Sequence, residues 1–160
     1  MDKNLDNFMS LRKNDFVEKM KNATDEDWAL LDEALKRNWP EPTILVWALK
    51  VVAGETEING NLTDVACTIL YKVFLNFSYA YEVDKNTLNG LSKLLGNKEA
   101  KYKYARFRAA RIILLLSDVI LKNNISNDVL NEAVSVAREF VDDEDVGEIA
   151  KEDLSRMNCC

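Results

Sequence analysis

Hydrophobic residues recur along most of the chain at the spacing of an α-helix. The clearest case is residues 126–141, where apolar residues from Leu130 onward recur at i, i+3, i+4, i+7 and i+11 and the opposite face is polar. Similar patterns predict helices over residues 24–37, 43–53, 62–77, 85–95, 98–122 and 144–157. Residues 2–22 predict one or two short helices, with a break around Asn14.

Helix boundaries are marked by short local signals. Thr24 is followed by Asp25, Glu26 and Asp27, a capping residue and acids that suit the positive end of a helix dipole. The segment 39–42, Trp-Pro-Glu-Pro, must end that helix. Residues 43–53 are nearly all apolar, a pattern that fits a buried strand as well as a helix. Their length and the flanking helices favour a helix.

Three predicted helix pairs begin at Glu41, Lys85 and Asn127, a pitch near 43 residues. This pitch falls within the range of roughly 40–47 residues that is typical of two-helix solenoid repeats. Equivalent positions hold similar residues, namely Leu45, Leu88 and Leu130; Val52, Leu95 and Ala137; and Ala66, Ala109 and Ala150. Because one helix pair cannot bury its own apolar stripe, such pairs stack. Helices of medium length can also give these spacings by chance, and both readings stay open.

The expected fold is therefore all-α. We expect a compact stack of about seven helices arranged as antiparallel pairs, either a HEAT-like α-solenoid or an irregular helical bundle. Residues 1–157 would form a single helical domain, followed by a short tail over residues 158–160.

One stretch, about residues 91–116, resembles a HEAT-type repeat. It reads Leu-Ser-Lys-Leu-Leu-Gly-Asn from Leu91 and Arg-Phe-Arg-Ala-Ala-Arg-Ile-Ile-Leu from Arg106, a Leu-rich helix followed by a helix with an Arg-x-x-Ala-Ala-like start. The chain departs from the family pattern in the extra residues 99–105, and the other two pairs lack the arginine. The resemblance implies a binding scaffold.

Composition narrows the class of protein. The net charge of −6 argues against nonspecific binding of nucleic acid over the whole surface. The longest apolar run, residues 44–53 interrupted by Lys50, is shorter than the roughly 20 residues that span a bilayer. The N-terminus has no apolar segment of the signal-peptide kind, so we expect a cytoplasmic protein without membrane contact. The high content of Lys and Asn suggests an AT-rich genome, such as that of a phage or a low-GC bacterium.

Residues that commonly carry chemistry are scarce. The chain has no histidine, which removes the commonest general base and most zinc sites, and it has neither a Gly-rich phosphate loop nor a Cys-x-x-Cys pair. The segment 142–153 has the glycine spacing of a calcium loop, but Val146 at its fifth position cannot supply a side-chain oxygen. Cys67 is expected in the core, and Cys159 and Cys160 form an oxidisable tail. We therefore expect no catalytic residues, no metal site and no cofactor.

The strongest positive signal is a basic segment, residues 98–111, with six Lys or Arg residues and the single acid Glu99. On a helix, Lys101, Tyr104, Arg108 and Arg111 would form one stripe of candidate partner-binding residues. Three readings stay open: binding to an acidic protein surface, binding to a phosphate backbone, or neutralisation within the fold by the acidic residues 142–153.

Three aromatic residues, Trp39, Tyr79 and Tyr81, are expected at helix ends or in loops, where binding residues concentrate. Together these patterns predict a non-catalytic protein–protein interaction module, such as an adaptor or a phage-encoded inhibitor of a host complex. The alternative is a nucleic-acid-associated helical protein that binds phosphates through the basic segment.

Overall fold

The fold was analysed in a computed structural model that describes residues 3–37, 39–54, 60–77, 85–119 and 126–157. Its elements are α1 (Lys3–Met9), α2 (Lys13–Met20), α3 (Asp25–Lys36), α4 (Pro42–Val52), α5 (Gly60–Phe77), α6 (Lys85–Leu95), the 3₁₀ helix η1 (Ala100–Tyr102), α7 (Lys103–Val119), α8 (Asn127–Glu139) and α9 (Gly147–Met157). The described residues contain no strand, so the prediction of an all-α fold is confirmed. The apolar segment predicted over residues 43–53 is a helix rather than a strand, with α4 running from Pro42 to Val52.

The number of helices and the start of one helix differ from what the sequence predicts. The described residues hold nine α-helices rather than about seven, because the N-terminal stretch forms the two short helices α1 and α2. The helix expected over residues 98–122 begins instead as the separate 3₁₀ turn η1, and α7 starts at Lys103. Asn97 holds this turn, since its side-chain oxygen accepts a hydrogen bond from the backbone N–H of Glu99 at 3.1 Å.

Helix α3 begins where the sequence predicts. The backbone N–H of Asp27 donates to the Thr24 hydroxyl at 3.2 Å, and the backbone N–H of Thr24 donates to the Asp27 carboxylate at 3.0 Å. Lys19 of α2 pairs with the same carboxylate at 3.3 Å. Burial acts to raise the pKa of Asp27, but the hydrogen bonds from Thr24 and Lys19 outweigh it, so this pKa lies below its ordinary value.

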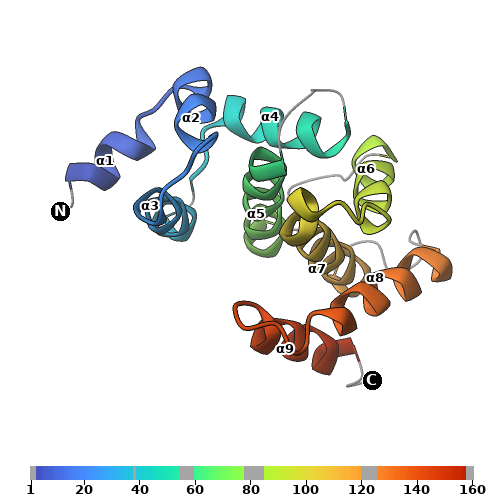
Figure 1. The fold of residues 1–160 in the computed structure, drawn as a ribbon. Coiled ribbons are helices and arrows are strands. Elements are labelled where there is room, and N and C mark those ends of the chain that lie inside the picture. The colour runs from blue at the N-terminus through green and yellow to red at the C-terminus, as the bar shows by residue number, and fades with distance from the viewer. Residues whose placement is uncertain (1–2, 38, 55–59, 78–84, 120–125, 158–160) are drawn as a thin grey trace.

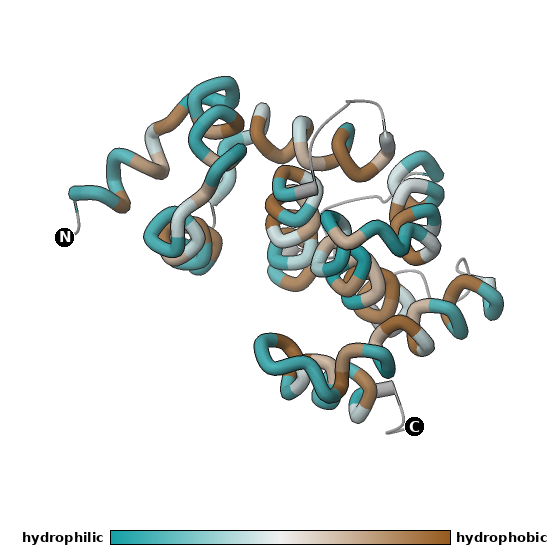
Figure 2. Tube along the Cα trace, in the orientation of Figure 1, coloured by the Kyte–Doolittle hydropathy of each residue, from teal (hydrophilic) through white to brown (hydrophobic). Residues whose placement is uncertain are grey.

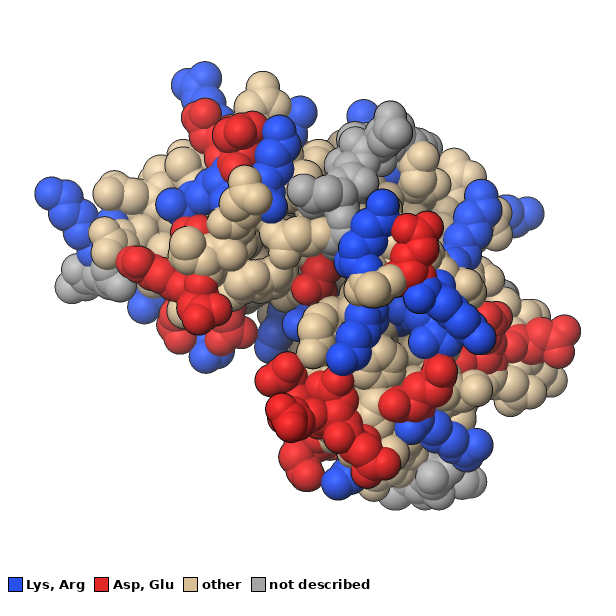
Figure 3. Space-filling view, in the orientation of Figure 1, with Lys and Arg blue, Asp and Glu red and all other residues tan. Residues whose placement is uncertain are grey.

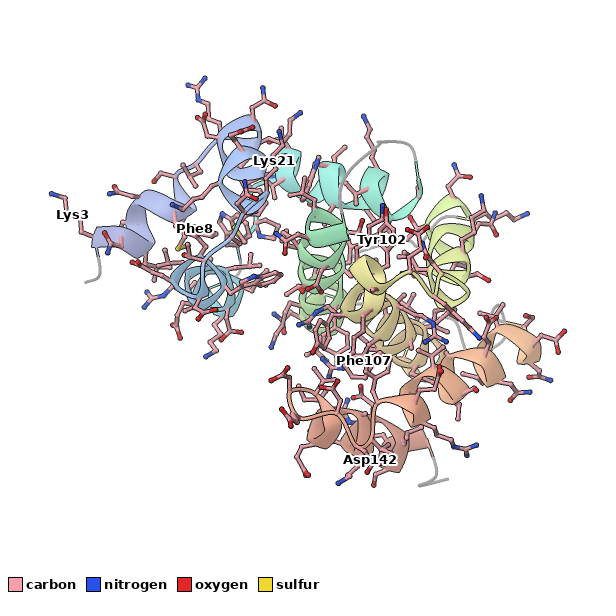
Figure 4. All side chains as sticks on the ribbon, viewed as in Figure 1. Lys3, Phe8, Lys21, Tyr102, Phe107 and Asp142 are labelled. Atoms are coloured by element: carbon pink, nitrogen blue, oxygen red, sulfur yellow. The ribbon has the colours of Figure 1, made fainter. Side chains whose placement is uncertain are left out.

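The first helices pack around a cluster of aromatic rings. Phe8 of α1 and Phe16 of α2 lie with their ring centroids 5.7 and 5.3 Å from that of Trp39, and Phe16 also contacts Trp47 of α4. Figure 4 shows Phe8 between α1 and α3. Trp39, one of the three aromatic residues expected where binding residues concentrate, lies in the core instead: it is only 6% exposed, because the rings of Phe8 and Phe16 pack against it. The other two, Tyr79 and Tyr81, lie outside the described residues.

Later helices pack as consecutive pairs. Helix α4 contacts α5, α6 contacts α7, and α8 contacts α9. The first helices of successive pairs also touch, α4 with α6 and α6 with α8, and so do the second helices, α5 with α7 and α7 with α9 (Figure 1). The first helices begin at residues 42, 85 and 127 and the second at residues 60, 103 and 147, so each pair follows the last after 42–44 residues.

Positions equated by the sequence repeat have equal burial. The three alanines of the second helices, Ala66, Ala109 and Ala150, are all fully buried. Val52, Leu95 and Ala137 are buried as well, whereas Leu45, Leu88 and Leu130 are half-buried in every pair. Hydrophobic positions of α4, α5 and α7 gather at the centre of the molecule (Figure 2). One connected cluster of buried residues runs from Leu5 to Ala150.

Helices α4 and α6 approach each other most closely at Gly90. A Cβ atom built there would lie 1.8 Å from the carbonyl oxygen of Val52 and 2.9 Å from the Cα of Ala53. Both are backbone atoms at the end of α4, so a side chain at this position forces the two helices apart. The close stacking of the first two pairs therefore requires a glycine at position 90.

Gly90→Ala is expected to lower the free energy of unfolding by about 3 kcal/mol, the upper range for overpacking of a packed interior. Urea denaturation measures the change. Gly96→Ala is the matched control, because a Cβ there meets only the carbonyl oxygen of Lys93 at an ordinary 3.7 Å. Equal stabilities of the two variants would contradict the close approach of α4 and α6.

Asp27→Asn is expected to make the free energy of unfolding less dependent on pH in the acidic range. The folded pKa of Asp27 lies below the unfolded value of about 3.9, so its charge stabilises the fold above that value and this contribution is lost as pH falls through the folded pKa. We expect the variant to be about 1 kcal/mol less stable near neutral pH and to converge on the wild type in strong acid. Denaturant titrations across this pH range test it, and a constant difference at every pH would contradict it.

Candidate interaction surface on η1 and α7

The basic segment 98–111 lies on one face of the molecule. Figure 3 shows Lys and Arg side chains gathered over the centre of this face and Asp and Glu side chains gathered next to them, towards α9. Tyr104, Arg108 and Arg111 all lie on α7, whereas Lys101 lies on η1. The spacing of 100° per residue therefore does not continue from Lys101 to the other three residues.

Arg108 pairs with the preceding helix pair. Its Nε lies 2.5 Å from a carboxylate oxygen of Asp64 on α5, and the two side chains are 26% and 16% exposed. Burial raises the pKa of Asp64, and the charge of Arg108 offsets part of that rise. Burial also raises the pKa of the neighbouring Cys67 thiol to about 12, so this cysteine stays protonated near neutral pH. Cys67 is fully buried, as its apolar surroundings predict.

Arg111 joins three second helices. Its guanidinium donates to both carboxylate oxygens of Asp153 on α9, at 2.6 and 3.3 Å, and to the hydroxyl of Tyr71 on α5 at 2.9 Å. The same guanidinium carbon lies 4.0 Å from the centre of the Tyr71 ring, a cation–π contact. The side chains of Arg111 and Asp153 are only 13% and 6% exposed. This ion pair is thus part of the packed interior.

The start of α7 contacts the acidic connection between α8 and α9. Tyr104 donates its hydroxyl to Asp145 at 3.0 Å, and Lys103 pairs with Asp143 at 3.0 Å. The hydrogen bond to Asp145 raises the pKa of Tyr104. The backbone N–H of Asp145 and the ammonium of Lys103 lower the pKa of Asp143. Residues 142–153 therefore do pair with part of the basic segment, one of the three readings that the sequence left open.

Arg106 of α7 connects the two helices of the α6–α7 pair. Its Nε donates to the carbonyl oxygen of Leu95, at the end of α6, at 2.7 Å. Its other nitrogen pairs with Glu139, the last residue of α8, also at 2.7 Å. The first contact satisfies a carbonyl at a helix end that has no intrahelical partner. This arginine thus links three helices.

Lys98 and Lys101 are exposed cations of the segment that have no ion pair to another helix within the described residues, whereas the exposed Lys103 pairs with Asp143. Lys101 pairs with Glu99 at 3.5 Å, but the two side chains are 61% and 64% exposed, so this contact adds little stability. Lys98 is exposed, and within the described residues no ion pair is seen for it. Half-buried Tyr102 lies beside them, its ring centre 5.4 Å from the Lys101 nitrogen. Tyr102 is the last residue of η1 and lies at the start of α7 (Figure 4).

Two residues that pair with the arginines of α7 were not among the candidates from sequence. Asp64 is the single acid of the largely apolar helix α5, and Tyr71 stands on the same helix. An isolated carboxylate in a helix that is apolar on most sides is a signal of a buried ion pair. Its partner could not be read from the sequence, because Arg108 is 44 residues away.

No known protein family, curated protein or solved structure matches this chain. Within the described ranges, no helix is long and apolar enough to cross a membrane. Nor does that part of the chain bring together three or more Cys, Asp or Glu side chains that could hold a metal ion.

Arg111→Ala is expected to destabilise the protein by about 3 kcal/mol, because it leaves the buried, charged Asp153 with only the more distant Arg156, at 3.8 Å. The double variant Arg111→Met with Asp153→Leu is expected to recover most of that loss, since it removes both charges and keeps apolar volume. Thermal and urea denaturation of both variants measure this. Lys101→Ala serves as the control at an exposed pair and should change stability by less than about 0.5 kcal/mol. A double variant as unstable as Arg111→Ala would show that the ion pair is not the cause.

Proposed function

We propose that this protein is a non-catalytic interaction module, a HEAT-like stack of helix pairs that docks on an acidic surface of a partner protein. The observation that carries the proposal is the order of packing. First helices stack on first helices and second on second, at intervals of 42–44 residues. Arrays of this kind expose long surfaces that other macromolecules can contact, and each pair touches only its neighbours.

The HEAT-like resemblance gains support from the role of Arg106. This residue opens the Arg-x-x-Ala-Ala-like stretch, and its bond to the Leu95 carbonyl ties the second helix of the pair to the end of the first. The residues that depart from the family pattern, 99–105, form η1 and the first turn of α7. The extra stretch thus extends the connection between two helices that still pack as a pair.

The proposed contact surface is centred on Lys101, together with Lys98 and the adjoining Tyr104. Lysines at such a position attract a negatively charged surface over the range of a Debye length, about 8 Å at physiological salt. Arg108 and Arg111 belong to the same predicted stripe, but their charges face carboxylates of this chain. In this proposal Arg108 and Arg111 stabilise the packing of the helices beneath the surface, and Lys98 and Lys101 contact the partner.

The alternative of a nucleic-acid-binding protein is favoured less by this arrangement. Each phosphate that a cation neutralises adds roughly one unit of negative slope to log affinity against log salt. With Arg108 and Arg111 paired inside the fold, few cations of the segment remain for phosphates. In the proposed function, the protein acts as an adaptor or as a phage-encoded inhibitor of a host complex, and it contacts an acidic surface of its partner.

Lys98→Glu with Lys101→Glu is expected to reduce capture of the partner from a lysate of the native host by at least about tenfold, since both charges then repel an acidic surface. Quantitative affinity capture with mass spectrometry measures this, and thermal unfolding should be unchanged because both side chains are exposed. Lys3→Glu with Lys50→Glu makes the same change in net charge at exposed positions on α1 and α4 and should leave capture intact.

A nuclease treatment separates the two candidate functions. Capture that survives nuclease and depends on Lys98 and Lys101 supports a protein partner. Capture that disappears with nuclease would instead support the nucleic-acid alternative. Equal capture by both double variants would exclude this surface.

A further inference from the structure

Helix α9 is attached to the rest of the molecule by a small apolar surface and by polar contacts. Among residues 147–156, the part of α9 whose side chains the structure describes, Gly147, Ala150 and Asp153 are buried, and Ile149 and Leu154 are half-buried. Helix α7, by contrast, buries residues 112–116, all Ile or Leu. Burial of apolar area is the main source of stabilisation, and α9 buries far less of it than α7 does.

Electrostatic contacts add to the limited apolar packing of Val146, Ala150, Ile149 and Leu154. Asp153 binds Arg111, Arg156 lies 3.8 Å from the Asp153 carboxylate, and Arg156 also interacts with the Tyr71 hydroxyl. Just before the helix, Asp143 and Asp145 contact Lys103 and Tyr104. An acidic segment therefore covers the basic surface of α7, as an acidic partner would.

We infer that α9 is a displaceable internal ligand, and that the surface it covers on α5 and α7 can bind an acidic helix of a partner protein. This inference rests on the proposed function and deepens it. Local opening of elements with few buried apolar contacts is common in folded proteins. Release of α9 would expose the guanidinium of Arg111 together with the face of Tyr71.

The contacts of α9 define what the competing helix must contain. A carboxylate has to reach Arg111, and the residue three positions earlier has to be small, because Ala150 is fully buried in that place. Residues three apart lie on the same helix face. The partner helix is therefore expected to present Ala or Gly followed three residues later by Asp or Glu, within an acidic sequence.

Gly147 offers a way to loosen α9 without replacing any of the charged residues that contact α7. A Cβ atom at this position would lie 2.7 Å from the carbonyl oxygen of Val141, a backbone atom in the turn before α9. An alanine must shift that turn. Phe140, at the end of α8, would keep its contact with Phe107 of α7, where the ring centroids are 4.9 Å apart. Figure 4 shows Phe107 between α7 and the α8–α9 hairpin.

Hydrogen–deuterium exchange on the full chain tests the release of α9. We expect amides of residues 147–157 to exchange at least about tenfold faster than those of α5 and α7. Gly147→Ala should raise exchange in α9 further and leave α5 and α7 unchanged. Ser155→Ala, at an exposed position of α9, is the matched control. Protection of α9 equal to that of α7 in the wild type overturns the inference.

A labelled peptide with the sequence of residues 144–157 tests the surface beneath α9. Fluorescence anisotropy should show binding to the Gly147→Ala protein at least about tenfold tighter than to the wild type, whose own α9 competes. A peptide with lysine in place of Asp153 should not bind. If Gly147→Ala does not fold, Asp153→Asn serves as the loosened protein. A loosened, folded variant that fails to bind the acidic peptide overturns the inference.

The outcomes also separate this inference from the proposed function. Partner capture that depends on Lys98 and Lys101 but does not increase when α9 is loosened overturns the displacement and leaves the interaction module standing. If the peptide binds the loosened protein but capture does not depend on Lys98 and Lys101, the displaceable helix is supported. The proposed docking surface on the two lysines is then excluded.

Discussion

Burial of helix α7 is the constraint on which the rest of the structure depends. This helix packs against α5, α6, α8 and α9, so neighbours cover most of its circumference. Its alanines at 105, 109 and 110 are buried and let those neighbours come close, and residues 112–116 fill the space beyond them. A helix surrounded in this way has few positions where a charged side chain can reach water. Its three arginines therefore lie at the seams between helices, and each of them meets a carboxylate there.

These ion pairs fix the register of the stack more than they add to its stability. A buried ion pair is often no better for stability than apolar residues of the same volume, because both charges lose their water. However, the contacts of Tyr104, Arg108 and Arg111 all join residues 40–44 positions apart, the distance of one helix pair. A helix that slipped by one residue would leave buried charges without partners. The ion pairs and hydrogen bonds of Tyr104, Arg108 and Arg111 thus select one helix register among others that would bury the apolar stripes equally well.

The sequence predicted the elements better than it predicted their partners. Helical periodicity reports which face of a segment is apolar, and for the helices from α3 onward this located each element. The spacing near 43 residues likewise pointed to the pairs, and the equal burial of Ala66, Ala109 and Ala150 agrees with it. Helices α1 and α2 carry too few turns for a clear period, so their number stayed open.

The errors arose where tertiary contacts decide the outcome. Trp39 sits in a Pro-rich connection, which normally lies at the surface, but the rings of Phe8 and Phe16 enclose it. The basic stripe assumed one helix from Lys98, whereas η1 changes the direction of the chain before α7 begins. Asp64 and Tyr71 were absent from the candidates, because a count of charges along one helix does not show what faces it from another.

The internal pairing changes what a partner would meet at this face of the molecule. Read from the sequence, residues 98–111 carry six cations and one acid. In the fold Lys103, Arg106, Arg108 and Arg111 each pair with a carboxylate from a different part of the chain, which leaves Lys98 and Lys101 as exposed cations without such a pair. Two such lysines support only a weak, salt-sensitive attraction. Tighter binding of an acidic partner here requires more cations, and two of them, Lys103 and Arg111, now pair with α9 and its preceding turn. The strength of binding at this surface is therefore tied to how firmly α9 stays in place.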